Sequence, residues 1–206
     1  MKKLMSMSVV AAFVALTLAP SAFAATATSG PFTTSASVSG TLTLTTVIKK
    51  NSSTGATITT MDFGQLTDIG TGTLRSSATG TTGTGAADMF ITANSHGLPY
   101  TITQTGTAMS NGSTTLPAGA LTVVPVYAAA DNGGATMPTG ASLGSAGTWV
   151  STNKVLYTSE TGTAAMRTIQ AIYSVTDDPT AGSTASVPLN QAAGTYSGTV
   201  TITVTA

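Results

Sequence analysis

The feature that most constrains this chain is a strict alternation of apolar and polar residues near both ends. Near the N-terminus the apolar members all occupy even positions, separated mainly by Thr and Ser: Phe32, Ala36, Val38, Leu42 and Leu44. The end of the chain repeats the pattern at Tyr196, Val200, Ile202 and Val204. A period of two places alternate side chains on opposite faces of a β-strand. Both segments are therefore predicted to be strands with one buried face, although chain ends are more often polar and frayed.

Residues 1–24 have the pattern of a secretion signal. Lys2 and Lys3 supply a positive start, Val9 to Leu18 an apolar stretch, and Ala22-Phe23-Ala24 the small residues of a cleavage site. A membrane anchor is the alternative, but the apolar stretch is short for a span. We expect export, with Ala25 as the new N-terminus, and no direct membrane insertion.

The composition excludes several classes of partner. The chain has seven basic and seven acidic residues, and removal of Lys2 and Lys3 leaves 7 − 2 = 5 basic residues, a net charge of 5 − 7 = −2. Nucleic acids and anionic membranes require clustered Lys and Arg, so neither is an expected partner. The chain has no cysteine, which excludes disulfides and thiol chemistry in an exported protein.

Short alternating segments with turn signals between them predict an all-β fold. Beyond the two ends, the strands are expected within residues 56–66, 89–92, 100–105, 121–127, 149–157 and 168–175. The Gly-rich stretch 68–87 is expected to be a long loop or weakly paired edge, and Pro125 favours an edge position or a bulge in its strand. A β-sandwich is the prediction, with a closed barrel as the alternative.

The candidate residues for catalysis or metal binding are few. His96 is the only histidine and lies in a turn-like sequence, Asn94 to Pro99, so no histidine metal cluster or pair of bases can form. Asp62, Asp68 and Asp88 do not form a calcium-loop motif and are expected to be solvated loop carboxylates. The sequence thus predicts no catalytic residues, no metal and no cofactor.

The remaining motifs have structural interpretations. Asp177-Asp178-Pro179 is expected to be a turn, and Gly70-Thr71-Gly72 lacks the following Lys or helix of a phosphate loop. Asn51 and Asn111 match the N-glycosylation pattern only weakly. Trp149 is expected to anchor the core, with carbohydrate stacking as its alternative role.

Three segments resemble bacterial chaperone–usher pilins. The tail from Asn190 to Val204 contains Ala193-Gly194-Thr195-Tyr196 followed by an alternating strand, which is similar to the C-terminal end of these subunits. Met61-Asp62-Phe63-Gly64 resembles a recurrent pilin strand. Ala36-Ser37-Val38-Ser39-Gly40 resembles the start of the cysteine-free subunits of colonisation factor fimbriae, although those usually have Asp-Pro where this chain has Ser39-Gly40.

The resemblance implies an incomplete immunoglobulin-like β-sandwich, residues 39–206, preceded by a donor-strand extension, residues 25–38. It implies partners as well: copies of the chain, other pilus subunits, a periplasmic chaperone and an outer-membrane usher. The donor strand would be Ala27 to Val38, and the wall of the acceptor groove would be the C-terminal strand. The implied donor residues are Gly30, Phe32, Ala36 and Val38, and the implied groove residues are Tyr196, Val200, Ile202 and Val204.

We therefore expect a non-enzymatic structural subunit of a cell-surface fimbria, polymerised by donor-strand exchange and serving adhesion or biofilm formation. The alternatives are a monomeric secreted adhesin or carbohydrate-binding sandwich and an exported hydrolase. An N-terminal strand that pairs within its own domain has the same period of two, so that possibility stays open at this point.

Overall fold

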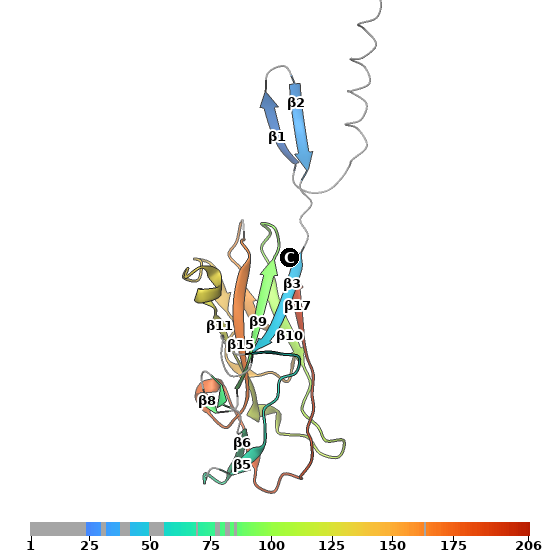
Figure 1. Cartoon of the computed structure of the whole chain (residues 1–206), viewed down its shortest axis with the longest axis vertical. Helices are drawn as coiled ribbons and strands as arrows, with labels where there is room; N and C mark the ends of the chain where they lie inside the picture. The colour runs from blue at the N-terminus through green and yellow to red at the C-terminus, as the bar shows by residue number, and fades with distance from the viewer. Residues whose placement is uncertain are drawn as a thin grey trace, which may run out of the picture. The chain divides into compact units, whose positions relative to one another are not determined.

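A computed structural model describes residues 24–29, 32–37, 42–49, 56–68, 70–76, 79–80, 83–84, 86–162 and 164–206 (Figure 1). The chain divides into two compact units, Met1–Gly40 and Thr41–Ala206. In the first unit, β1 (Ala24–Ser29) pairs antiparallel with β2 (Phe32–Ser37). The segment expected as one donor strand is thus divided in two, and Gly30-Pro31, a turn-favouring dipeptide, separates the halves in sequence.

The second unit is built on two main antiparallel sheets. The larger has the order β13-β11-β15-β9-β3-β4, with strands Gly147–Thr148, Leu121–Tyr127, Arg167–Val175, Ala86–Asn94, Thr43–Lys49 and Thr57–Ile58. The smaller has the order β12-β14-β10-β17, with strands Ser142–Leu143, Ser151–Thr158, Thr101–Gly106 and Val200–Thr205. The described strands form separate sheets, as the all-β sandwich prediction required.

Shorter elements complete the second unit. One sheet has the order β16-β6-β5, with strands Val187–Pro188, Thr73–Ser76 and Leu66–Asp68, and β7 (Thr79–Gly80) pairs with β8 (Gly83–Thr84). The 3₁₀ helices are η2 (Ala118–Ala120), η3 (Ala129–Asn132) and η4 (Pro179–Ala181). Among the described residues, no helix has the length and apolar character needed to span a membrane.

Alternation of side chains along the strands produces the core. On β15, the expected inward residues Ile169, Ala171, Tyr173 and Val175 are all fully buried. Trp149 is buried and its ring stacks on Phe63, with centroids 5.2 Å apart. The prediction that Trp149 anchors the core is therefore confirmed.

The strand order matches that of an immunoglobulin-like sandwich. Such domains pair strands A-B-E-D in one sheet and C-F-G in the other. Here β3-β9-β15-β11 has the first order, and β10-β17 corresponds to C-F. No described strand lies on the outer side of β17, where strand G would be found.

Several strand boundaries differ from the expectations. Residues 61–65 are irregular because the Asp62 carboxylate accepts the Gly64 N–H at 2.9 Å, and Gly64 has a φ of 68°. The stretch 68–87 contains short strands rather than one long loop. Pro125 lies beyond the two residues of β11 that pair with β13, so its position at a free edge is confirmed.

Candidate functional site

The C-terminal strand β17 is half-buried on one face. Val200, Ile202 and Val204 pack against the core but are only partly buried. The intervening residues Thr201, Thr203 and Thr205 are exposed and lie opposite Thr105, Thr103 and Thr101 of β10. The predicted alternation of this strand is therefore present, and its apolar face is incompletely covered.

The backbone of β17 presents hydrogen-bonding groups at the open edge. The Thr107 N–H donates to the Thr199 carbonyl at 3.0 Å, so Thr199 points its backbone groups toward β10. Orientation alternates along an antiparallel strand, which means that Val200, Ile202 and Val204 point theirs away from β10. The same three residues thus offer apolar side chains to the core and backbone donors and acceptors to the open edge.

Strand β3 forms the second wall of this edge. Its register with β9 places Leu44, Thr46 and Ile48 opposite Ala93, Ile91 and Met89, all three of which belong to the core. Ile48 packs on the core, but Leu42 and Leu44 are each 39% exposed. On the edge of β3 that faces away from β9, β4 pairs only with Ile48 and Lys49. No described strand pairs with the rest of that edge.

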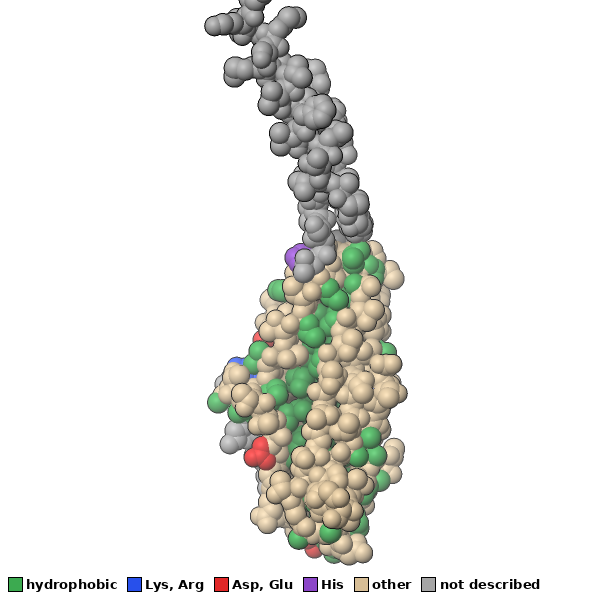
Figure 2. Space-filling model, turned by 90° about the vertical axis from the view of Figure 1, so that its right-hand side faces the viewer, with side chains coloured by type: hydrophobic (Ala, Val, Ile, Leu, Met, Phe, Trp, Pro, Cys, Tyr) green, Lys and Arg blue, Asp and Glu red, His purple; other side chains and the backbone are tan. Residues whose placement is uncertain are grey.

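These two strands border a hydrophobic channel, which we call the seam groove. Figure 1 shows β3 and β17 side by side along one side of the sandwich, and Figure 2, turned toward that side, shows a stripe of hydrophobic side chains between ridges of other residues. We assign five residues to it: Val200, Ile202 and Val204 of β17, which are partly buried against the core, and the exposed Leu44 of β3 with Leu42 just before that strand. An apolar stripe of this kind beside a strand edge that pairs with no other described strand is uncommon on a monomer surface.

Tyr196 does not lie on this strand, because β17 begins at Val200. Its hydroxyl instead joins three groups: it accepts from Gln191 Nε2 at 2.8 Å, donates to the Ala192 carbonyl at 2.6 Å, and lies 2.8 Å from Thr114 Oγ1. The expectation that Tyr196 continues the strand is wrong, since these hydrogen bonds hold it in a loop.

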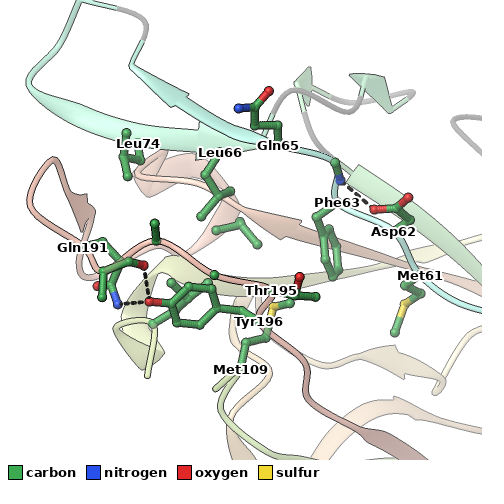
Figure 3. A pocket seen from close by; sticks show the side chains of 16 residues that line it. Met61, Asp62, Phe63, Gln65, Leu66, Leu74, Met109, Gln191, Thr195 and Tyr196 are labelled. Carbon is green, nitrogen blue, oxygen red and sulfur yellow. Dashed lines mark hydrogen bonds between the residues drawn. The ribbon is translucent and has the colours of Figure 1, made fainter. Parts of the chain in front are cut away.

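Tyr196 lines a cavity of about 480 Å³, which we call the foot cavity (Figure 3). The segments 61–66 and 191–196 form two of its walls, and the core supplies Leu74, Met109, Leu116 and Val175. The Ser76 hydroxyl donates to the Phe63 carbonyl and helps hold the first segment in place. The volume lies within the range of small-ligand pockets, and the lining is mixed, with polar residues such as Asp62, Gln65 and Gln191 beside the apolar ones.

The donor residues named from the sequence fall in the first unit. Phe32 and Ala36 lie in β2, whereas Gly30 and Val38 lie outside the described residues.

The candidate titratable residues are dispersed. His96 is exposed in a turn, with a φ of 52°, and its N–H is bonded to the Asn94 side chain at 2.9 Å. Asp62 and Asp68 accept N–H groups of nearby glycines, as turn residues do. Asp88 is fully buried in β9, so its expected loop position is wrong. In the described part of the chain, no group of three or more His, Cys, Asp or Glu residues could hold a metal ion.

The other motifs also have local roles. Asp178 caps η4 and accepts the Thr180 N–H at 2.8 Å, while Asp177 forms an ion pair with Arg75. The Asn111 side chain closes a turn by accepting the Thr114 N–H at 2.8 Å. Asn51 lies outside the described residues. These contacts stabilise loops.

Burial raises the pKa of three tyrosines. The pKa of Tyr157 is raised to about 12, first by loss of solvent and then by the nearby Glu160 carboxylate. Burial also raises those of Tyr100 and Tyr173 well above 10. All three phenols stay protonated at neutral pH, where they serve packing and hydrogen bonding.

Sequence reasoning missed two parts of the site. It placed Leu42 and Leu44 in the N-terminal alternation, but the structure places them on the wall opposite β17. It also missed the foot cavity, because the Met61–Leu66 and Gln191–Tyr196 segments are far apart in sequence. The sequence contained a signal for the β3 wall, because the alternation of apolar residues at even positions includes Leu44 and resumes at Ile48.

Comparison with known proteins gives no relatives: no family model, no curated protein and no solved structure matches this chain.

Proposed function

We propose that this protein is a structural, non-enzymatic subunit of a surface pilus or fimbria that polymerises by donor-strand exchange. The observation that carries the proposal is the seam groove. Its apolar floor is half covered, and the backbone groups of Val200, Ile202 and Val204 face an edge that an immunoglobulin-like sandwich would fill with a further strand.

A strand added beside β17 would satisfy both deficiencies. Its backbone would pair with β17 and supply affinity, and alternate side chains would enter the groove and supply specificity. In the extension, Phe32, Ala36 and Val38 occupy even positions, so their side chains would all face the groove. Gly30, also at an even position, would let the two backbones approach closely. The outward phase contains Thr33, Ser35 and Ser37, which would extend the threonine rows of β10 and β17 by cross-strand hydroxyl pairs.

The exposed edge also supports the expected partners. A long unpaired edge with apolar side chains promotes aggregation, so an exported subunit of this kind requires protection until it assembles. A periplasmic chaperone would cover the groove, and an outer-membrane usher would pass the subunit to other pilus subunits. Adhesion or biofilm formation at the cell surface is the role that such a polymer would serve.

The structure gives less support to a monomeric carbohydrate-binding module. Trp149, the residue that suggested sugar stacking, is 3% exposed and stacks on Phe63 inside the core. It therefore offers no aromatic platform to a saccharide.

Gel electrophoresis of material sheared from cells that express the full chain tests the proposal. A non-covalent strand-exchanged polymer should give a ladder in steps of one subunit when unboiled and one band after boiling. Ile202→Asp should abolish the ladder, because it places a charge on the groove floor, whereas the neighbouring Thr203→Asp faces solvent and should retain it.

The donor strand offers a matched pair of its own. Ala36→Asp should abolish the ladder and Ser37→Asp should retain it, since the two positions have opposite phase. Deletion of residues 25–38 should leave only monomer. A ladder that survives this deletion or Ile202→Asp would contradict the proposal.

A further inference from the structure

The foot cavity lies at the end of the sandwich opposite the start of β3. Val175 is the last residue of β15, and Met109 and Leu116 follow the end of β10. At the other end, Thr43 opens β3 and pairs with Asn94, the last residue of β9. The C-terminus lies at that same end, beside the start of β3 (Figure 1). We call the two ends the foot and the tip.

A short link would bring the tip of one copy to the foot of another. Only four residues, 39–42, separate the donor segment from Thr43, and four residues span at most about 14 Å. The extension joins its own sandwich at the tip. Strand β17 runs from the foot, where Val200 lies opposite Gly106, to the tip, where Thr205 lies opposite Thr101. A donor strand that pairs antiparallel with β17 of another copy would therefore end at the foot of that copy, and the short link would hold the tip of the donor copy close to it.

The tip carries an exposed apolar side chain that no described contact explains. Met166 is 57% exposed, the highest value among the large exposed hydrophobic residues of the described chain. It precedes Arg167, which pairs with Ala93 of β9, so Met166 lies two strands from β3, about 10 Å away. Arg167 and Glu160 pair with each other at 3.0 Å, so this ion pair adds no net charge beside Met166.

The foot cavity matches such a side chain in chemistry. Met61, Phe63 and Met109 line it (Figure 3), and thioethers pack well against other thioethers and aromatic rings. Thr195 and Gly64, both exposed, belong to its lining. These exposed members leave the cavity accessible from the surface.

We propose that Met166 of one copy docks in the foot cavity of the next copy and so fixes the angle between successive subunits. This inference rests on the proposed function, because strand exchange is what brings the tip and the foot together. It adds a second contact between neighbouring sandwiches, independent of the seam groove.

Cysteine pairs test the contact directly, since the chain has no cysteine of its own. The full-length variant with Met166→Cys and Thr195→Cys is assembled, oxidised and boiled without reductant. A ladder that survives boiling and collapses with reductant is the expected result. The control carries Val155→Cys and Thr195→Cys, because Val155 is 40% exposed on β14, away from the tip, and its ladder should collapse on boiling.

The outcomes separate the two proposals. An unboiled ladder that collapses on boiling for both pairs would overturn the Met166 contact and leave strand exchange intact. Survival of both ladders would also overturn it, because the cross-link would then lack specificity; so would a small molecule found in the cavity of assembled subunits. Absence of any ladder from the unmodified chain would overturn the proposed function, and this inference with it.

Discussion

Replacement of Leu42 and Leu44 by threonine should weaken donor-strand binding without removing the wall that they form. Both side chains are 39% exposed. Leu44 lies on the core side of β3, opposite Ala93, and Leu42 immediately precedes the strand. Threonine suits a strand because its side chain is β-branched, but it lacks most of the apolar surface of leucine that an added strand would cover.

The size of the effect follows from that exposure. Full burial of a leucine side chain is worth about 1.5–3 kcal/mol, so burial of the exposed 39% is worth about 0.6–1.2 kcal/mol for each residue. The two together give about 1.2–2.4 kcal/mol, which corresponds to a roughly 8- to 60-fold weaker dissociation constant.

Peptide binding measures this constant without the complication of polymer growth. The chain would begin at Ser39, because Thr41–Ala206 forms a compact unit of its own. A labelled peptide of residues 25–38 would be titrated against it, and anisotropy would report the bound fraction. Val155→Thr is the matched control, since Val155 is 40% exposed on β14, outside the groove.

The expected result is a weaker constant for the leucine double variant and an unchanged constant for Val155→Thr. Equal affinity of the parent chain and the double variant, with both folded by circular dichroism, would refute the assignment of β3 as a groove wall.

Three further predictions concern stability. Tyr173→Phe should lower the free energy of unfolding in urea by about 1–3 kcal/mol, because Gln104 Oε1, fully buried, loses the phenol that donates to it at 2.5 Å. Alkaline pH should destabilise the fold, because burial raises the pKa of Tyr157 to about 12 and also raises that of Tyr173 above its ordinary value of 10.0. The stability that these neutral phenols contribute is fully present below pH 10.0, the pKa of the unfolded phenols, and is lost as pH rises through about 12. Urea unfolding at about pH 9 and about pH 11 should therefore give a lower midpoint at the higher pH. Gly106→Ala should lower the melting temperature, since its Cβ would overlap the Trp149 carbonyl.

Much of the fold follows from period-two patterns in the sequence. The strand 121–127 was predicted with the observed bounds, and the predicted strand 168–175 differs from β15 by one residue. In β15 the alternation is long and the inward residues Ile169, Ala171, Tyr173 and Val175 are buried, so local pattern and tertiary packing agree. The prediction of a strand over 56–66 was wrong because an Asx turn at Asp62, a side-chain effect, interrupts the extended backbone.

The site was only partly predictable. Val200, Ile202 and Val204 could be named because one strand contains the pattern, but a groove needs two walls. That Leu44 lies opposite Ala93 depends on the register between β3 and β9, which a single sequence does not define. For Tyr196 the pattern was misleading. It occupies an even position like Val200, Ile202 and Val204, yet its hydrogen bonds to Gln191 and Ala192 place it in a loop before the strand.

The composition of the chain fits an assembly held by packing and backbone pairing. Without cysteine there can be no disulfide between copies, and with 7% charged residues ion pairs can contribute little. The remaining sources of cohesion are apolar burial and main-chain hydrogen bonds, and the seam groove offers both along one edge. An added strand can supply both kinds of contact at once. Its backbone forms hydrogen bonds with the edge strand, and its alternate side chains enter the groove. The exposed threonines of β17 and their partners on β10 fit this account as well, since uncharged hydroxyl rows let a further Ser- and Thr-rich strand join the sheet without charge repulsion.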